Sequence, residues 1–407
     1  MVQEDSRLLA IVERIEPPLV LLEDGLGRGT STLAWGESAR LRLPWEPSHL
    51  GALDRFDPGD EWIGAIAYDL GLPPHARRRD PVLQLPVVEL FRPLNRIVLR
   101  PGARAACFGP DAERLWRSTP SPVSRAPART AARVPGSSRL SLDQAAFEAA
   151  VRSALEYIRA GDIYQVNLSV SEQFRAAASP WAAYLSLRSI NPSPWMGYAD
   201  FGDWQLVCGS PELLVEVSGG MARARPIAGT RRKTGDPGHD AAMRHELATD
   251  VKESAEHVML VDLARNDLGR VGRYGTVRVA ELAVIEEYSH VMHLVSDVRA
   301  RLRGAARPWD VFRALFPGGT ITGAPKIRSM EIIAELEPSA RGMYTGALGW
   351  WAGGMGQWNI LIRTAVMRGG EAVIQAGAGI VADSDPSREW KESLRKAAAL
   401  REAFGLA

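Results

Sequence analysis

The alternation of hydrophobic and polar residues predicts a chain of mixed helices and strands. Before residue 117, short apolar runs at 19–22, 62–68 and 82–90 are separated by glycine and proline, which is typical of strands joined by loops. Farther along the chain, helical and strand patterns alternate without an internal repeat. Periodicity by itself predicts no more than a mixed α and β fold.

An amphipathic helix is predicted to begin at Ser141. Gln144 completes a capping box with Ser141, and Gly161 is a natural stop for the helix. The apolar stripe that we expect this helix to bury consists of Phe147, Val151, Leu155 and Ile158.

The segment that follows, IYQVNLSV at 163–170, alternates as a strand. One side of it carries the larger residues Tyr164, Val166, Leu168 and Val170. The other side carries Gln165, Asn167 and Ser169. Taken alone, this polar row indicates a sheet face exposed to solvent.

Two more helices are predicted, one over residues 240–267 and one that begins at Asp385–Pro386, where an acidic cap precedes a proline. The first would bury Leu247, Val251, Ala255 and Val258, and the second Trp390, Leu394, Ala397 and Phe404. Charged residues lie on other faces of these helices: Glu253 and Glu256 on the first, and Glu389, Glu392 and Lys396 on the second.

Residues 117–139 are rich in Pro, Ser, Ala and Arg and contain no aromatic residue. Such a segment cannot bury a core, so we interpret it as an exposed linker. It divides the chain into a β-rich N-terminal region, residues 1–116, and a C-terminal region, residues 140–407.

Composition narrows the classes of function. The balance of 49 Lys and Arg residues against 48 Asp and Glu residues argues against a nucleic-acid partner. Cys107 and Cys208 are too few for a disulfide framework or a zinc cluster, which fits a reducing cytoplasm. The first residues do not read as a signal peptide, and no apolar stretch approaches membrane-spanning length. We therefore expect a cytoplasmic protein without a membrane segment.

Two glycine-rich segments, at 315–327 and 376–393, indicate a binding site for a small anion. Only glycine leaves backbone N–H groups uncovered for a ligand that approaches closely. The pairs Glu253/Glu256 and Glu389/Glu392 suit Mg²⁺, which takes one or two carboxylates and keeps positions for water and substrate. The alternative is that both pairs are solvated helix faces. The helix expected from Asp385 directly follows the turn expected at Gly377–Ala378–Gly379. This arrangement favours a metal site over a solvated helix face.

Arg363 is a single charge in the apolar strand expected at NILIRTAV. Such an arginine is usually paired or holds a carboxylate in its fork. The backbone at Gly229–Thr230 could serve a second carboxylate. Together these residues describe a dicarboxylate that Mg²⁺ holds at one end and that Arg363 and glycine amides hold at the other.

Three other patterns do not define sites of their own. The stretch from Gly318 to Lys326 is not a P-loop, because Ala324–Pro325 precedes the lysine and no hydroxyl residue follows it. His290 and His293 lack a third ligand nearby, so we interpret one of them as a hydrogen-bonding site residue. Cys208 lacks the Gly-x-Cys-x-Gly elbow of a glutamine amidotransferase and is interpreted as a packing residue.

Nine collinear motifs over about two thirds of the chain resemble those of the chorismate-utilising enzymes, and among them the synthase subunits of aminodeoxychorismate synthase and anthranilate synthase. The motifs are GDIYQVNLS, SPELL, PIAGTRR, ESAEHVMLVDLARNDLGR, SHVMH, FPGGTITGAPK, YTGALGW, IRTAV and AGAGIVADSDP. The resemblance implies an α+β fold, in which two large antiparallel β-sheets pack as a sandwich with helices outside and the active site in the cleft. Residues 140–407 would form the chorismate-binding catalytic domain.

The resemblance also implies roles for single residues. Glu212 falls on the general acid that protonates the leaving C4 hydroxyl, a task that needs a raised pKa. The metal ligands for Mg²⁺, which would clamp the ring carboxylate, are Glu256, Glu389 and Glu392. The residues expected to hold the substrate are Gly229, Thr230, Tyr344, Arg363, Gly377, Gly379 and Lys396, with His293 near the reacting ring.

Four positions bear on the nucleophile and the product. Isochorismate and salicylate synthases carry a lysine at the position of Gln165 to activate water, so a neutral amide there implies ammonia as the nucleophile. Asn167 favours the aminodeoxychorismate branch. Ala228 is the anthranilate synthase residue, where many aminodeoxychorismate synthases carry a lysine. Asp24, which departs from the anthranilate synthase residue at its position, favours the same branch as Asn167. We weigh Asn167 and Asp24 slightly above Ala228 and predict 4-amino-4-deoxychorismate, which leads to p-aminobenzoate and folate. The alternatives are anthranilate synthase component I and a non-catalytic chorismate-binding subunit.

The resemblance further implies a partner and a regulatory difference. Without a nucleophilic cysteine elbow the chain cannot release ammonia from glutamine, so a class I glutamine amidotransferase subunit would supply it. Asp24 follows Leu21–Leu22–Glu23 where anthranilate synthases typically use a serine to sense tryptophan. A carboxylate there would repel the carboxylate of the amino acid, so we expect little feedback inhibition.

Overall fold

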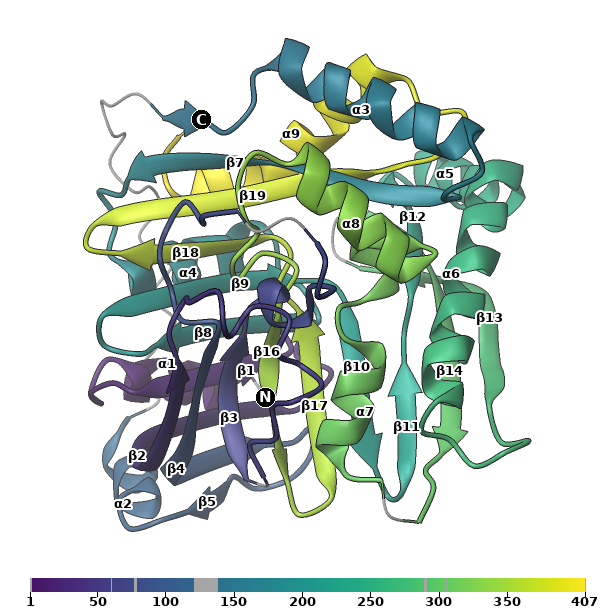
Figure 1. The fold of residues 1–407 in the computed structure, drawn as a ribbon. Helices are drawn as coiled ribbons and strands as arrows, with labels where there is room; N and C mark the ends of the chain where they lie inside the picture. Colours follow the sequence, from purple (N-terminus) through teal and green to yellow (C-terminus); the bar gives the residue numbers. More distant parts are fainter. Residues whose placement is uncertain are drawn as a thin grey trace.

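The strands pair in one continuous antiparallel series that bends into two limbs (Figure 1). In this computed structural model the described residues are 2–59, 61–76, 79–120, 138–288, 291–304 and 306–406. The first limb consists of β6 (Arg139–Leu140), β7 (Gln165–Arg175), β19 (Glu371–Ile380), β18 (Thr364–Arg368), β9 (Trp204–Ser210) and β8 (Trp195–Asp200). The second consists of β16 (Ala347–Ala352), β17 (Met355–Ile360), β10 (Leu213–Ser218), β11 (Met221–Ala224), β14 (Val291–Arg301), β12 (Ile227–Arg232) and β13 (Arg278–Glu287).

Strands of the N-terminal region connect the two limbs. The bridge runs through β1 (Leu19–Glu23), β2 (Ser31–Leu43), β4 (Val88–Leu99) and β3 (Trp62–Ile66), with β5 (Ala106–Phe108) beside β4. At its two ends, β1 pairs with β8 and β3 pairs with β16. The α+β class is therefore confirmed, and the two sheets that the resemblance implied are limbs of one series. The regions on either side of the expected linker share this series, and most of that linker, residues 121–137, lies outside the described residues.

Helices pack against the limbs and against the bridge (Figure 1). Their bounds are α1 Val2–Val12, α2 Ala112–Ser118, α3 Gln144–Arg159, α4 Pro180–Ile190, α5 Pro237–Thr249, α6 Val251–Gly269, α7 Pro308–Leu315, α8 Lys326–Leu336 and α9 Pro386–Ala403. Two short 3₁₀ turns, η1 (Tyr68–Gly71) and η2 (Gly319–Ile321), lie in the loops. Separate apolar clusters lie beneath α1, α2 and α4, and beneath α3 and α8; α9 contributes to both.

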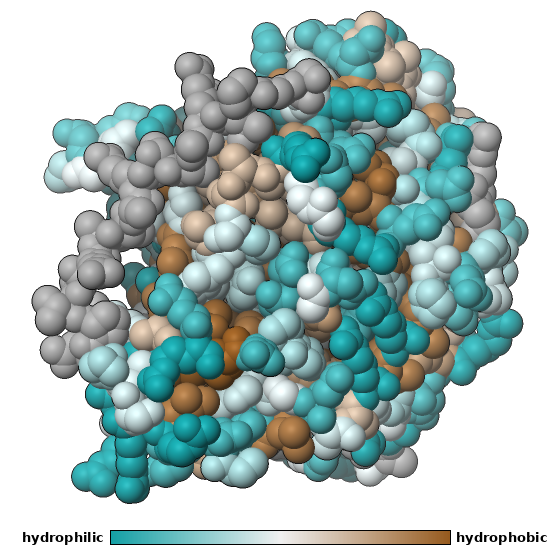
Figure 2. All heavy atoms as spheres, turned by 90° about the vertical axis from the view of Figure 1, so that its left-hand side faces the viewer, coloured by the Kyte–Doolittle hydropathy of each residue, from teal (hydrophilic) through white to brown (hydrophobic). Residues whose placement is uncertain are grey.

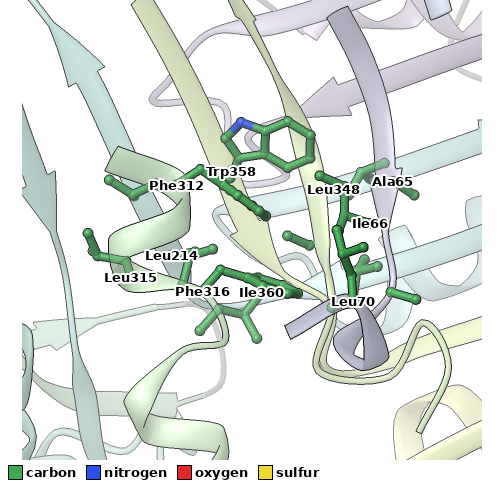
Figure 3. Packing of buried hydrophobic residues seen from close by; sticks show 14 of the residues in the cluster. Ala65, Ile66, Leu70, Leu214, Phe312, Leu315, Phe316, Leu348, Trp358 and Ile360 are labelled. Atoms are coloured by element: carbon green, nitrogen blue, oxygen red, sulfur yellow. The ribbon is translucent and has the colours of Figure 1, made fainter. Parts of the chain in front are cut away.

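The largest apolar cluster joins residues of the bridge and of the second limb to residues of β8 and β9 in the first limb, and Figure 3 shows its part between β3 and α7. Ile66 of β3 and Leu348 of β16 lie on one side of the part shown, and Leu214 and Ile360 lie on the other. Aromatic rings extend this cluster to α7, where the ring centroids of Phe312 and Trp358 are 4.9 Å apart. Burial of so much apolar surface is the main term that holds the limbs together.

Two of the places where the chain crosses between the limbs lie next to each other. Residues 211–212 connect β9 to β10, and residues 361–363 connect β17 to β18. The amide of Gly209 donates to the carbonyl oxygen of Arg363 at 3.0 Å, and the amide of Ile360 donates to that of Glu212 at 3.1 Å. These bonds hold the two crossings side by side and place Glu212 and Arg363 at the same corner of the fold.

The start of α3 differs from the prediction. Asp143, not Ser141, caps the helix, since its carboxylate accepts from the amide of Ala146 at 2.8 Å. The hydroxyl of Ser141 instead accepts from the amide of Ser171, on the neighbouring strand β7. The capping box was therefore the wrong interpretation, because a tertiary contact engages its first residue. The start of α9 at Pro386 with Asp385 as cap is confirmed.

The single helix predicted over 240–267 is wrong. Asp250 ends α5 and caps α6, and its carboxylate accepts from the amides of Lys252 and Glu253, each at 3.0 Å. The break changes the phase of the helix, so Val251 and Val258 are 82% and 57% exposed instead of buried. Ala255 is exposed as well. The residues that α6 buries are His257, Leu260, Val261, Asp267 and Leu268.

Among the described residues, none of the helices has both the length and the apolar character needed to cross a membrane. On the face drawn in Figure 2, hydrophobic side chains show only in separate areas between hydrophilic ones.

Candidate active site

A cavity of about 180 Å³ lies between the two limbs, next to the chain crossings. Most of the residues singled out in the sequence line it: Gln165, Asn167, Glu212, Ala228, Gly229, Thr230, Glu256, Tyr344, Arg363, Gly377, Gly379 and Lys396. A larger surface hollow, of about 580 Å³, is lined by four arginines of β11, β13 and β14 and contains none of these residues. The cavity is therefore the candidate site, although it is not the largest hollow.

The polar row of β7 is buried instead of facing solvent, and Gln165 and Asn167 of that row line the cavity. Gln165, Asn167 and Ser169 are all buried, so the exposed sheet face that the alternation indicated is wrong. Gln165 donates from Nε2 to Oε1 of Glu256 at 2.6 Å. The side-chain oxygens of Gln165 and Asn167 are buried and have no hydrogen-bond partner in the described part of the chain. Buried polar atoms are rarely left unpaired, so these two oxygens indicate a ligand.

Gly377 and Gly379 lie within β19, and the turn expected there is wrong. Opposite them on β7, the amides of Ser169 and Asn167 donate to Glu337 and to Thr322, away from β19. These are therefore non-hydrogen-bonded pairs, and the glycine amides point to the other edge of β19. A Cβ atom on the second glycine would lie 2.6 Å from Nε2 of Gln165, so any larger residue would displace the amide of Gln165.

Glu212 lies at the first chain crossing and is buried. Its Oε1 accepts from the hydroxyl of Thr320 at 2.8 Å. Burial raises the pKa of Glu212 to about 7, and the hydrogen bond from Thr320 opposes the shift. A carboxyl group with this pKa holds a proton near neutrality and can donate it inside the cavity.

Arg363 lies in the bend between β17 and β18 with φ of +50°, not inside one strand as expected. This backbone conformation is strained for arginine, and the residue lines the cavity. Burial lowers the pKa of Arg363, and the carboxylate of Glu392 opposes that shift. Tyr344 also lines the cavity, and its pKa is raised by burial. Arg363 and Tyr344 thus offer a cation and a hydroxyl to an anionic ligand.

A bulge in β12 shapes the opposite wall. The register with β14 shifts between Ala228 and Thr230, and Gly229 takes φ of +59° there. The hydroxyl of Thr230 lies 2.9 Å from Nδ1 of His293. Burial lowers the pKa of His293 to about 4, so the ring is neutral at pH 7. His293 itself lies behind this wall and does not line the cavity, and His290 lies outside the described residues.

The family model described as "chorismate binding enzyme" matches residues 27–402. The chain is a member of the chorismate binding enzymes. It is 52% identical over 261 residues to aminodeoxychorismate synthase component 1 of Bacillus subtilis, an alignment of 64% of this chain and 56% of that protein. It is 51% identical over 263 residues to anthranilate synthase component 1 of Thermus thermophilus, covering 64% of this chain and 57% of that protein. The aligned region thus spans little more than half the length of these relatives.

Solved structures show the same fold for this chorismate binding enzyme. Anthranilate synthase component I from Streptococcus pneumoniae superposes with a TM-score of 0.77 at 30% identity, covering 91% of this chain and 92% of that one. A menaquinone-specific isochorismate synthase from Escherichia coli gives a TM-score of 0.77 at 21% identity, covering 98% and 91% of the two chains. The second likeness concerns the fold alone.

The acidic residues of this chorismate binding enzyme are not equivalent. Glu256 lines the cavity, and burial raises its pKa, with Glu253 nearby adding to the rise. Glu253 is itself bound to Arg231 at 3.1 Å, so it is not free to serve a ligand. Glu389 and Glu392 lie outside the cavity lining; burial raises the pKa of Glu389. Glu392 pairs with Arg395 at 2.6 Å and with Lys396 at 3.6 Å.

Some residues of the site were not predicted from the sequence. Thr320 and Gln375 line the cavity, as do the apolar residues Ile227, Leu260, Ile321, Ile362 and Ala376. Thr320 belongs to the first glycine-rich segment, which was predicted to bind an anion. A hydroxyl residue in such a segment could have been named as a candidate from the sequence. Lys326, at the end of that segment, bonds to Asp267 at 2.6 Å and not to the cavity, and Cys208 is a fully buried packing residue.

Proposed function

We propose that this chain aminates chorismate with ammonia and releases 4-amino-4-deoxychorismate. The observation that carries the proposal is the pair of buried, unpartnered amide oxygens of Gln165 and Asn167 on the cavity wall. Ammonia brings three N–H donors, and neutral amide oxygens can orient it without protonating it. A chain that activated water would need a base where Gln165 stands, and its amide nitrogen is already committed to Glu256.

The substrate carries two carboxylates, and the cavity offers two places for them. Arg363, Tyr344 and the outward amides of Gly377 and Gly379 suit the enolpyruvyl carboxylate, because a guanidinium fork and free N–H groups bind oxygen pairs. Lys396, which donates from Nζ to the carbonyl oxygen of Gly377 at 3.1 Å, lies near the place for the ring carboxylate. Both ends would then be fixed relative to Glu212.

Glu212 would donate its proton to the C4 hydroxyl, which leaves as water. Thr320 occupies Oε1 of that carboxyl group, so the proton resides on Oε2. When ammonia has added to the ring, the surplus proton on nitrogen can return to the carboxylate, which restores the acid. His293, which lies behind the wall and is fixed through Thr230, would support that wall from outside the cavity without adding a charge.

The residues present also fit a magnesium ion. Mg²⁺ needs only one or two carboxylates from a protein, so a group of three acidic ligands, absent among the described residues, is not required. Glu256 and Glu389 would hold the ion, with Glu392 beside them, because both of the first two carboxylates have raised pKa values that a bound cation would offset. The ion, when bound, would draw negative charge toward the ring carboxylate.

Ala228 bears on the order of the steps. It lies on the cavity wall and is almost fully buried, and its methyl group cannot attack C2 of the ring. A first addition at C2, which expels the protonated C4 hydroxyl as water, would therefore fall to ammonia itself or to another small nucleophile. When ammonia then adds at C4, that first nucleophile leaves C2, so the product carries a single amino group. The ammonia would come from a class I glutamine amidotransferase subunit in the cytoplasm, as the likeness to component 1 synthases supports.

Ala228 equally supports a second candidate, anthranilate synthase component I, which would release anthranilate and pyruvate. The likeness to the Thermus thermophilus enzyme supports it to a similar degree. A non-catalytic binding subunit is disfavoured, since it would have no need to gather Glu212, Glu256 and Arg363 around one cavity.

The test is to supply the purified chain with chorismate, ammonium and Mg²⁺, and to follow pyruvate release and anthranilate fluorescence. We expect no pyruvate, and a product that an added lyase converts to p-aminobenzoate. Stoichiometric pyruvate with anthranilate would establish the second candidate instead. No consumption of chorismate would support the binding subunit.

A further inference from the structure

A buried ion pair lies behind the walls of the cavity. The side chains of Arg341 and Glu337 are 1% and 5% exposed. The guanidinium grips both carboxylate oxygens, with Nη2 to Oε1 at 2.8 Å and Nε to Oε2 at 3.0 Å. Neither residue lines the cavity, so the pair does not touch a ligand there.

The other donors of Arg341 reach segments that do line the cavity. Nη1 donates to the carbonyl oxygen of Ile321 at 2.8 Å, and Nη2 donates to that of Asn167 at 2.7 Å. Ile321 directly follows Thr320 in η2. The guanidinium also lies over the ring of Tyr344, with its carbon 5.6 Å from the ring centroid. One planar group thus contacts three parts of the cavity wall.

Glu337 extends the contacts to a fourth segment. Its Oε1 accepts from the amide and the hydroxyl of Ser169 at 3.0 and 2.7 Å. That hydroxyl accepts from Nε2 of Gln375 at 2.9 Å, and Gln375 lines the cavity on β19. Because the five donors of a guanidinium have fixed directions, the pair sets the spacing of these segments more rigidly than separate contacts would.

We propose that Arg341, held by Glu337, is a positioning residue for the reaction in the cavity. It fixes the segment of Thr320 and Ile321, which holds Glu212, against the wall formed by β7. The inference rests on the proposed function, since that reaction is the one it would affect. A pair with only a structural role could be replaced by apolar residues, because the desolvation of two charges offsets much of their attraction.

The test is the double variant Arg341→Met/Glu337→Leu, with Arg341→Lys as a second variant that keeps the charge and loses the fork. We expect the double variant to unfold cooperatively on heating near the wild-type Tm, with kcat for chorismate amination about 10²-fold lower, as misplacement by about 1 Å can cause. Arg341→Lys should show an intermediate kcat. Wild-type kcat in either folded variant would overturn the proposal.

The pH dependence of kcat/KM gives a second measurement, which a change in stability alone would not alter. Displacing Thr320 removes a hydrogen bond that lowers the pKa of Glu212, so the alkaline limb of kcat/KM should move to higher pH in both variants. The matched control is Arg401→Lys, because Arg401 pairs with Glu172 of the same strand β7, away from the cavity. It should lower Tm and leave kcat and the limb unchanged. An equal fall in kcat there would overturn the positioning role.

Crystal structures of the wild type and the double variant separate this proposal from the proposed function. If the wild type does not convert chorismate, the proposed function fails. The distance between Thr320 and β7 then decides the inference by itself. A displaced Thr320 segment in the double variant supports positioning, and an unmoved one overturns it.

Discussion

The hydroxyl of Thr320 donates to Oε1 of Glu212 at 2.8 Å, and it is the side-chain hydrogen bond that opposes the effect of burial on that carboxyl group. Thr320 comes from the glycine-rich segment before α8, whereas Glu212 lies at a chain crossing between the limbs. The acid strength of Glu212 therefore depends on a contact between segments more than a hundred residues apart.

Replacing Thr320 with valine should raise the pKa of Glu212, because the hydrogen bond that stabilises the ionised form is lost. An acid works below its pKa, so the alkaline limb of kcat/KM, expected near pH 7, should move to higher pH. Glu212→Gln should lower kcat by about 10²- to 10⁴-fold, the usual contribution of a general acid. Steady-state rates between pH 5 and 9 test both variants, and an unmoved limb in Thr320→Val would contradict the assignment.

Glu256→Gln should abolish most of the dependence on Mg²⁺ along with most of the activity, because the proposed metal site loses a carboxylate ligand. That carboxylate is the one that accepts from Nε2 of Gln165. The matched control is Glu253→Gln, one turn away on α6, whose carboxylate is bound to Arg231. The control should keep the wild-type response to added metal. Titration of chelated enzyme with MgCl₂ measures this, and full activity in excess chelator would refute the metal requirement.

Gly379→Ala should raise KM for chorismate, because the new methyl group would lie 2.6 Å from Nε2 of Gln165 and 3.5 Å from Oε1 of Glu256. The amide of Gln165 would have to move, and its bond to Glu256 would be lost. Gly269→Ala, at the end of α6 with open space around it, is the control and should leave KM unchanged. Equal KM values in the two variants would show that this edge of β19 does not bind substrate.

Activity with ammonium salts should need no second subunit, whereas activity with glutamine should appear only after a class I amidotransferase subunit is added. Cys208 is fully buried, and burial raises the pKa of its thiol to about 11, so it cannot act as the glutaminase nucleophile. Glutamate release by the purified chain measures this. Glutamine-driven turnover by the chain alone would sink the prediction.

Tryptophan should inhibit weakly. The carboxylate of Asp24 accepts from the amides of Leu26 and Arg28, at 3.0 and 2.8 Å, so its charge is fixed in the loop after β1. A fixed carboxylate repels that of a bound amino acid. Initial rates over a range of tryptophan concentrations check this, and inhibition at micromolar levels would show that the loop has another role.

Local rules predicted some elements well and failed where tertiary contacts decide. The start of α9 follows from Asp385 and Pro386 alone, because both the cap and the proline act within one turn. The break at Asp250 was missed, although an aspartate is a good cap, because the apolar residues on both sides fit one helical period. When the apolar residues on both sides of a break fit one helical repeat, the repeat does not reveal that the helix has ended and a new one has begun.

The candidate site was predicted in composition more than in geometry. Alternation placed Gln165 and Asn167 on one side of a strand but could not show that the second limb covers that side. Only the resemblance to a known family identified the row as functional. Likewise, the glycines at 377–379 were interpreted as a turn and are strand residues. Glycine occurs both where the backbone bends and where other atoms approach a strand closely, and the sequence alone does not separate the two cases.

Glu212 and Arg363 belong to the two chain crossings, which backbone hydrogen bonds hold side by side, whereas Gly379 and Gly229 belong to opposite limbs. Main-chain hydrogen bonds at one corner therefore set the spacing of Glu212 and Arg363, whichever side chains line the rest of the cavity. A substitution on either glycine wall would change how a ligand is held and would leave these two residues at the same separation.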